Sequence, residues 1–126
     1  MQEIIKKFKF RDKAVVLHAP SEIEKELVKN GFNTSFDKKT KSTNTLVFIN
    51  NQEEFLHFLN SELKNIEPDS VLWFAYPKGT SKIKTDINRD TLRTTAEKFG
   101  ITTVTAISIN DIWSALRFRP MEKVGK

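Results

Sequence analysis

Val71-Leu72-Trp73-Phe74-Ala75-Tyr76 is an unbroken apolar run that follows the turn at Asp69. Two similar runs come earlier in the chain, Ala14-Val15-Val16-Leu17-His18-Ala19 and Thr45-Leu46-Val47-Phe48-Ile49. Apolar runs without alternation indicate strands that are buried on both faces, which is typical of parallel sheets. We therefore expect three central strands that lie side by side and point the same way.

Helical patterns separate these strands. Ser21 and Glu24 have the spacing of a capping box, which predicts a helix over residues 21–30. Asn51 begins a similar pattern before the second helix, and a third helix is predicted over about 87–99. Strands that alternate with helices of this length form right-handed βαβ crossovers, so a sheet covered on both faces is expected.

The sequence as a whole predicts one α/β domain over residues 1–126, with a three-layer, Rossmann-like architecture and a mostly parallel sheet of about six strands. The alternating segment 32–36 supplies one further strand. Segments 103–109 and 114–118 are predicted to close the sheet as an antiparallel C-terminal hairpin.

The two ends of the chain are expected to lie outside the sheet. Residues 2–9 carry apolar side chains at helical spacing and predict a short N-terminal helix packed on the edge of the domain. Residues 120–126 are predicted to form a flexible tail.

Composition limits the compartment and the chemistry. The chain of 126 residues has a net charge of +5, from 21 basic and 16 acidic residues, and contains no cysteine. Disulfides and thiol chemistry are thereby excluded. No apolar run is long enough to cross a membrane, and Lys6, Lys7 and Lys9 interrupt any signal-peptide core. We therefore expect a cytoplasmic protein with no membrane association.

The order of elements over about residues 43–119 resembles the C-terminal half of the class I S-adenosylmethionine-dependent methyltransferase fold. That resemblance implies a glycine-rich cofactor turn after the first strand and an acidic residue after the second. Here the turn is His18-Ala19-Pro20-Ser21, which has no glycine, and Asp37 alone is placed as the acid. We therefore predict no cofactor. A small methyltransferase-like enzyme with a rebuilt cofactor turn is the alternative.

A second resemblance rests on two short motifs of the sequence. These are Tyr76-Pro77-Lys78 followed by Asp86, and Asp111-Ile112-Trp113-Ser114-Ala115-Leu116-Arg117-Phe118. Both motifs resemble sequences of an uncharacterised bacterial family of small domains of unknown function. The likeness covers nearly the whole chain; it implies the fold and supplies no activity.

The basic loop 78–86 is the main candidate for a ligand site. It follows a central strand and precedes a helix, and unpaired N–H groups at a helix start attract anions. If the hairpin turns at the same edge, Trp113 can stack on a base or sugar and Arg89 can hold a charged group. The candidate ligand-binding residues are His18, Tyr76, Lys78, Ser81, Lys82, Lys84, Arg89, Asn110, Asp111 and Trp113.

A purely structural interpretation of the same loop stays open. In that interpretation Asp86 or Asn88 caps the helix, the lysines are solvated, and Asp111 forms an ion pair with Arg89 or Lys78.

Neither metal binding nor catalysis is predicted. His18 and His57 have no ligand spacing with a carboxylate or a third ligand, and neither a nucleophile elbow nor a triad is present. Arg117 and Arg119 share one face of the last strand. Weak nucleic-acid binding through these arginines is therefore a further alternative function. The function expected is a non-catalytic binding domain for a small anionic or nucleotide-like ligand or a protein partner. The oligomeric state is not determined by the sequence.

Overall fold

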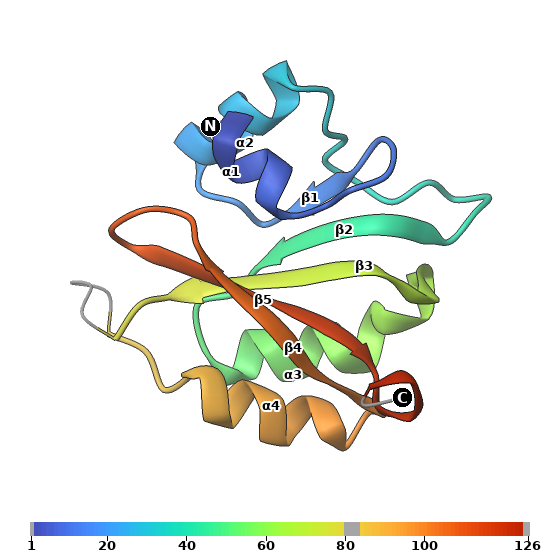
Figure 1. The fold of residues 1–126 in the computed structure, drawn as a ribbon, viewed down its shortest axis with the longest axis vertical. Coiled ribbons are helices and arrows are strands. Elements are labelled where there is room, and N and C mark those ends of the chain that lie inside the picture. The colour runs from blue at the N-terminus through green and yellow to red at the C-terminus, as the bar shows by residue number, and fades with distance from the viewer. Residues whose placement is uncertain (1, 80–83, 125–126) are drawn as a thin grey trace.

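The computed structural model describes residues 2–79 and 84–124. Its centre is a five-stranded sheet in the order β1-β2-β3-β5-β4 (Figure 1). The strands are β1 (Val15–Leu17), β2 (Ser42–Phe48), β3 (Ile66–Pro77), β4 (Ile101–Ser108) and β5 (Trp113–Pro120). The helices are α1 (Gln2–Lys7), α2 (Ser21–Lys29), α3 (Gln52–Ser61) and α4 (Arg89–Glu97), with short 3-10 turns at η1 (Leu63–Asn65) and η2 (Met121–Lys123).

The three apolar runs form the parallel part of the sheet, as the sequence predicts. Val16 lies opposite Leu46, and Leu46 lies opposite Trp73, all with parallel pairing. The antiparallel hairpin is also confirmed, but β5 lies between β3 and β4 and pairs antiparallel with both. The sheet is therefore mixed, and the expectation of a mostly parallel sheet is corrected.

The sixth strand predicted over 32–36 does not form. That segment makes a single parallel bridge, between Asn33 and Val15. Phe32 is buried, whereas Thr34 and Ser35 are exposed. One buried apolar side chain does not offset the entropy cost of ordering a full strand, so the chain leaves the sheet after the bridge.

Two core layers enclose the sheet. Helices α1 and α2 cover one face, and α3 and α4 cover the other (Figure 1). Because successive side chains of a strand point to opposite faces, Trp73 packs below α1 and Phe74 packs against α3. The indole Nε1–H of Trp73 donates to the carbonyl oxygen of Phe8 at 2.9 Å, which ties the segment after α1 to the sheet.

The helix starts differ from one another in their caps. The predicted capping box of Ser21 and Glu24 is absent, because Pro20 occupies the N-cap position of α2 and no side chain caps the helix. Proline fixes φ near −65° and presets the first turn without a side-chain hydrogen bond. Asn51 caps α3 as predicted, and Asn88 caps α4 through a capping box.

Part of the predicted C-terminal tail has regular structure. Pro120 is the last residue of β5, and the backbone N–H of Met121 donates to the carbonyl oxygen of Gly100 at 2.9 Å. That bond satisfies a backbone group at the end of β5 and holds η2 against the start of β4. Residues 125–126 lie outside the described part of the chain. In that part, no helix has both the length and the apolar character needed to cross a membrane.

Candidate functional site

The fold brings the predicted loop site to one edge of the sheet. Pro77 at the end of β3 lies opposite Trp113 at the start of β5. The backbone N–H of Lys78 donates to Ile112 at 2.7 Å, and its Nζ donates to the hydroxyl of Ser108 at 2.6 Å. Tyr76, Lys78 and the turn at 110–113 are therefore neighbours, as expected.

The polar groups of this edge are used mostly in holding the turn. The Asn110 Oδ1 atom accepts the backbone N–H groups of Ile112 and Trp113, both at 2.8 Å. Asp111 is exposed, and among the described residues it makes no ion pair with Lys78 or Arg89. The Asn110 contacts support a structural role for the turn, whereas the ion pair that the structural interpretation gave to Asp111 does not form among the described residues.

Trp113 cannot stack on a ligand, and this corrects the prediction. Its side chain is only 5% exposed and packs edge-on against Phe48, with ring centroids 5.1 Å apart. Strand alternation turns Trp113 into the core beneath α2 rather than towards the loop.

The remaining predicted residues of the loop differ in their exposure. Lys84 and Arg89 are exposed. Tyr76 is half-buried, and this burial raises the pKa of its phenol, an effect that the positive charge of Arg89 opposes. Ser81 and Lys82 lie outside the described residues.

Asp86 is a predicted alternative cap for α4, but its side chain does not cap that helix. Its Oδ1 atom accepts the backbone N–H of Gln52 at 2.8 Å, at the start of α3. Asp86 therefore links the loop to the neighbouring helix, while Asn88 caps α4.

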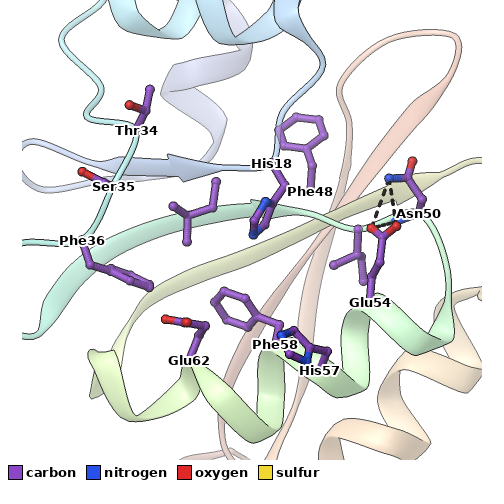
Figure 2. A pocket seen from close by; sticks show the side chains of 12 residues that line it. His18, Thr34, Ser35, Phe36, Phe48, Asn50, Glu54, His57, Phe58 and Glu62 are labelled. Atoms are coloured by element: carbon purple, nitrogen blue, oxygen red, sulfur yellow. Dashed lines mark hydrogen bonds between the residues drawn. The ribbon is translucent and has the colours of Figure 1, made fainter.

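A larger hollow lies at the carboxyl ends of β1 and β2. We call it the first-strand cavity; its volume is about 600 Å³, and α3 forms one of its walls. In Figure 2 the side chains of His18, Phe36 and Phe58 point into it from three different elements. Its other lining residues are Leu17, Thr34, Ser35, Phe48, Ile49, Asn50, Glu54, His57 and Glu62.

The cavity exists because the sixth strand is missing. After the bridge at Asn33 the chain runs past β1 as a loop and leaves this face of β1 without a covering helix. Leu17 and Phe36 are consequently only partly buried. An incompletely covered sheet at the carboxyl ends of its parallel strands is where open α/β sheets bind ligands.

His18 has an unusual backbone conformation at this edge. It follows β1 directly, and its φ of +62° lies in the left-handed region that non-glycine residues rarely adopt. The chain thus makes at His18 the type of turn for which glycine is favoured, but keeps a side chain there. Such strain is concentrated at functional sites, so His18 is the predicted residue that this cavity supports best.

Two carboxylates give the cavity its charge. Glu54 accepts the backbone N–H of Asn50 at 3.0 Å and the Nδ2 of the same residue at 3.1 Å. Glu62 accepts from the Nδ2 of Asn65 at 2.7 Å. Each carboxylate has capacity for further donors. The lining contains neither lysine nor arginine, so it favours hydroxyl, amine or cationic groups over phosphate.

A metal site is not assembled from these side chains. Within the residues that the structure describes, no three His, Asp or Glu side chains are grouped so that they could hold a metal ion.

Sequence reasoning found His18 and missed the rest of this cavity. The sequence pattern places Phe36 in a predicted strand, and it gives His57 no ligand role. The available signal was the spacing of Glu54, Phe58 and Glu62, which recur every four residues and therefore share one face of α3.

A basic depression adjoins the cavity at Phe36 and Glu62. It has a volume of about 400 Å³ and lies between the loop after residue 36 and η1. Its lysines are Lys38, Lys39, Lys41 and Lys64.

Comparison with known proteins supports the fold and gives no family. No protein-family model and no curated protein sequence matches this chain, so the likeness to a bacterial family of unknown function has no further support. The chain is similar in structure to a SAM dependent methyltransferase from Aquifex aeolicus, with a TM-score of 0.55 and 11% sequence identity. The match covers 93% of this chain and 87% of that one. The structure and this comparison place the chain in the α/β class, with a fold similar to that of a methyltransferase.

Proposed function

We propose that this chain is a small binding domain for a nucleoside-type ligand without phosphates, held in the first-strand cavity. The observation that carries the proposal is the cavity itself, a hollow of about 600 Å³ with aromatic rings and carboxylates on its walls. Hollows of this size are typical of sites for small molecules. The proposal departs from the anionic or nucleotide-like ligand expected from the sequence, because it excludes phosphate, and it moves the site from loop 78–86 to β1 and β2.

The lining residues supply the contacts that a nucleoside needs. Phe36 is partly buried, projects into the cavity and offers a ring for an aromatic base, whereas the buried ring of Phe58 packs against Phe74 and forms part of the cavity wall (Figure 2). Glu54 and Glu62 can accept hydrogen bonds from ribose hydroxyls. His18 stands at the end of β1, where it can donate to or accept from the ligand.

The charge of the cavity favours ligands that carry a cation. Two glutamates line the cavity without a lysine or arginine in the lining, and they attract an ammonium or sulfonium group; the lysines of the adjoining depression lie beyond Glu62. S-adenosylmethionine has this chemistry, and the solved structure similar to this chain is named as a SAM dependent methyltransferase. Adenosylmethionine is therefore the first probe.

Thermal unfolding and calorimetry with adenosylmethionine, adenosine and AMP test the proposal. Adenosylmethionine should bind most tightly and AMP most weakly. Phe36→Ala and Glu62→Gln should each weaken binding, whereas Lys78→Ala, outside the cavity, should leave it unchanged. Tighter binding of AMP than of adenosine would overturn the phosphate-free assignment and favour the adjoining lysines.

Methyl transfer is the second candidate function, and the structural similarity is the observation that favours it. It requires the same cavity and in addition a methyl acceptor. Absence of any adenosylmethionine binding at millimolar concentration would eliminate it. Release of adenosylhomocysteine in the presence of a cell extract, lost in the Glu62→Gln variant, would support it over binding alone.

A further inference from the structure

The basic depression beside the first-strand cavity differs from that cavity in the sign of its charge. Its lining includes two carboxylates, those of Asp37 and Glu62. Its four lysines are Lys38, Lys39, Lys41 and Lys64. The lysines outnumber the carboxylates, so a hollow of about 400 Å³ carries a local excess of positive charge.

The two carboxylates of the depression hold neighbouring parts of the chain. The Oδ1 atom of Asp37 accepts the backbone N–H of Lys39 at 2.8 Å, and the Oε2 atom of Glu62 accepts the Nδ2 of Asn65 at 2.7 Å. The ion pairs between described residues include none of the four lysines. Their ammonium groups are therefore not committed to a partner within the described part of the chain.

All four lysines are accessible to a partner in solution. Each of them is exposed; three lie in the loop before β2, and Lys64 lies on η1. A lysine is a mobile point charge without the fixed fork of a guanidinium, so a dispersed group of lysines is poorly suited to grip one small ion. Such a group suits an extended polyanion, which gains affinity by releasing several counterions at once.

An aromatic ring borders the same depression. Phe36 is partly buried and lines both the depression and the first-strand cavity. In Figure 2 Phe36 and Glu62 lie on the same side of that cavity. Proteins that bind single-stranded nucleic acid combine a basic groove for the backbone with aromatic rings on which bases stack. The ring therefore favours a nucleic acid over an acidic protein segment, which has no base to stack.

We propose that the basic depression binds single-stranded nucleic acid, with backbone phosphates on its lysines and a base against Phe36 on the side of the depression. A single strand is favoured over a duplex because its bases are free to stack on a side chain. A mononucleotide offers too few phosphates to bind well here, since affinity grows with the number of phosphates neutralised. This site is independent of the function proposed for the first-strand cavity.

Fluorescence anisotropy with a labelled oligothymidylate of about twelve nucleotides, within the usual length of such sites, tests the proposal. Affinity should fall about twenty- to fiftyfold between about 50 and 200 mM sodium chloride, the dependence expected when three or four phosphates of a single strand are neutralised. The triple variant Lys38→Gln, Lys39→Gln, Lys41→Gln should lose most of the affinity and most of the salt dependence.

A matched control removes the same charge elsewhere. The triple variant Lys6→Gln, Lys7→Gln, Lys25→Gln changes exposed positions on α1 and α2, outside the depression, and should bind the oligothymidylate nearly as tightly as the unmodified chain. Calorimetry with adenosylmethionine on the variant of Lys38, Lys39 and Lys41 tests the cavity separately. Those lysines do not line the cavity, so their loss should leave any adenosylmethionine binding unchanged.

Phe36→Leu separates nucleic acid from other polyanions. It should weaken binding of the oligothymidylate about fivefold or more, the loss expected with one stacked base. Binding of inorganic polyphosphate, measured by competition, should not change, because polyphosphate has charge and no base.

Several results would overturn the proposal. One is the absence of oligothymidylate binding at the lower salt concentration. Another is an equal loss of affinity in the two triple variants, which would show a general effect of net charge. Tighter binding of a duplex than of the single strand would exclude a single-stranded partner. Tighter binding of poly-glutamate than of the oligothymidylate, with no effect of Phe36→Leu, would assign the lysines to an acidic protein.

Discussion

Arg119 binds Asp69 through two hydrogen bonds, from Nε to Oδ1 at 2.9 Å and from Nη2 to Oδ2 at 3.2 Å. The pair joins the end of β5 to a residue of β3 with a φ of +55°. The hydrogen bond from Arg119 is the largest cause that holds the pKa of Asp69 below its ordinary value of 3.8. An exposed pair of this kind makes stability depend on pH through Asp69.

We expect Asp69→Asn to be less stable than the unmodified protein at neutral pH and equally stable in strong acid. A lowered carboxyl pKa stabilises the fold above the unfolded value and is lost as the pH falls through the folded value. Asparagine tolerates positive φ, so the backbone is kept. Melting temperatures of both proteins between pH 2 and 7 (about the range of carboxyl titration) measure the difference. A pH-independent difference would contradict this account.

Trp73→Phe should lower the free energy of unfolding by about 1–3 kcal/mol, the cost of leaving a buried acceptor unsatisfied. Trp73 is 1% exposed, and its indole is the donor to the Phe8 carbonyl. Urea unfolding measures the loss. Phe74→Leu, on the other face of the same strand, is a control for packing changes, because it leaves the bond to Phe8 intact. If amide exchange near α1 is no faster in Trp73→Phe than in the control, the bond does not hold this segment.

Trp113→Ala should destabilise the fold by about 3–5 kcal/mol, as do other truncations of large buried aromatic residues. The ring lies in the core against Phe48, so Trp113→Phe should recover most of the loss. Chemical denaturation compares the two variants. Near-normal stability of Trp113→Ala would show that the side chain is not a core residue.

His18→Gly should leave the free energy of unfolding unchanged or raise it by up to about 1 kcal/mol, since glycine adopts positive φ without strain. His57→Gly is the matched control and should cost about 0.3–0.5 kcal/mol, because His57 lies inside helix α3 and glycine has a lower helix propensity than histidine. His18→Gly should nevertheless weaken ligand binding in the first-strand cavity. A marked loss of stability in His18→Gly would show that its side chain is a structural support.

Tyr76 is the only tyrosine in the chain, so its titration can be followed by ultraviolet absorbance without interference. Burial raises the pKa of the phenol, and we expect ionisation above the ordinary value of 10. Because the raised pKa favours the neutral form in the folded protein, stability should fall as the pH rises past that value. Arg89→Gln removes an opposing positive charge and should raise the pKa further. An ordinary titration in the folded protein would contradict the burial.

The sequence by itself determined the parallel strands and the C-terminal hairpin. Continuous apolar runs such as 71–76 leave a strand no polar face to present to water, so burial on both sides follows from composition alone. The caps at Asn51 and Asn88 were also recognisable, because they depend on residues only three positions apart. The capping pattern at Ser21 was misleading because the proline before it presets the turn in another way.

Only the tertiary structure decided where the polar side chains meet. The sequence predicts Trp113 as a ligand contact, but the tertiary structure packs its ring against Phe48. The Nε atom of Arg117 is buried without a hydrogen-bond partner because of the segments that pack around it. His18, Phe36 and Glu62 all line the first-strand cavity. They lie close together because the strand predicted over 32–36 does not form beyond the bridge at Asn33. Local patterns fix elements because the forces within them act over a few residues, whereas sites arise from the packing of distant segments, which no local pattern records.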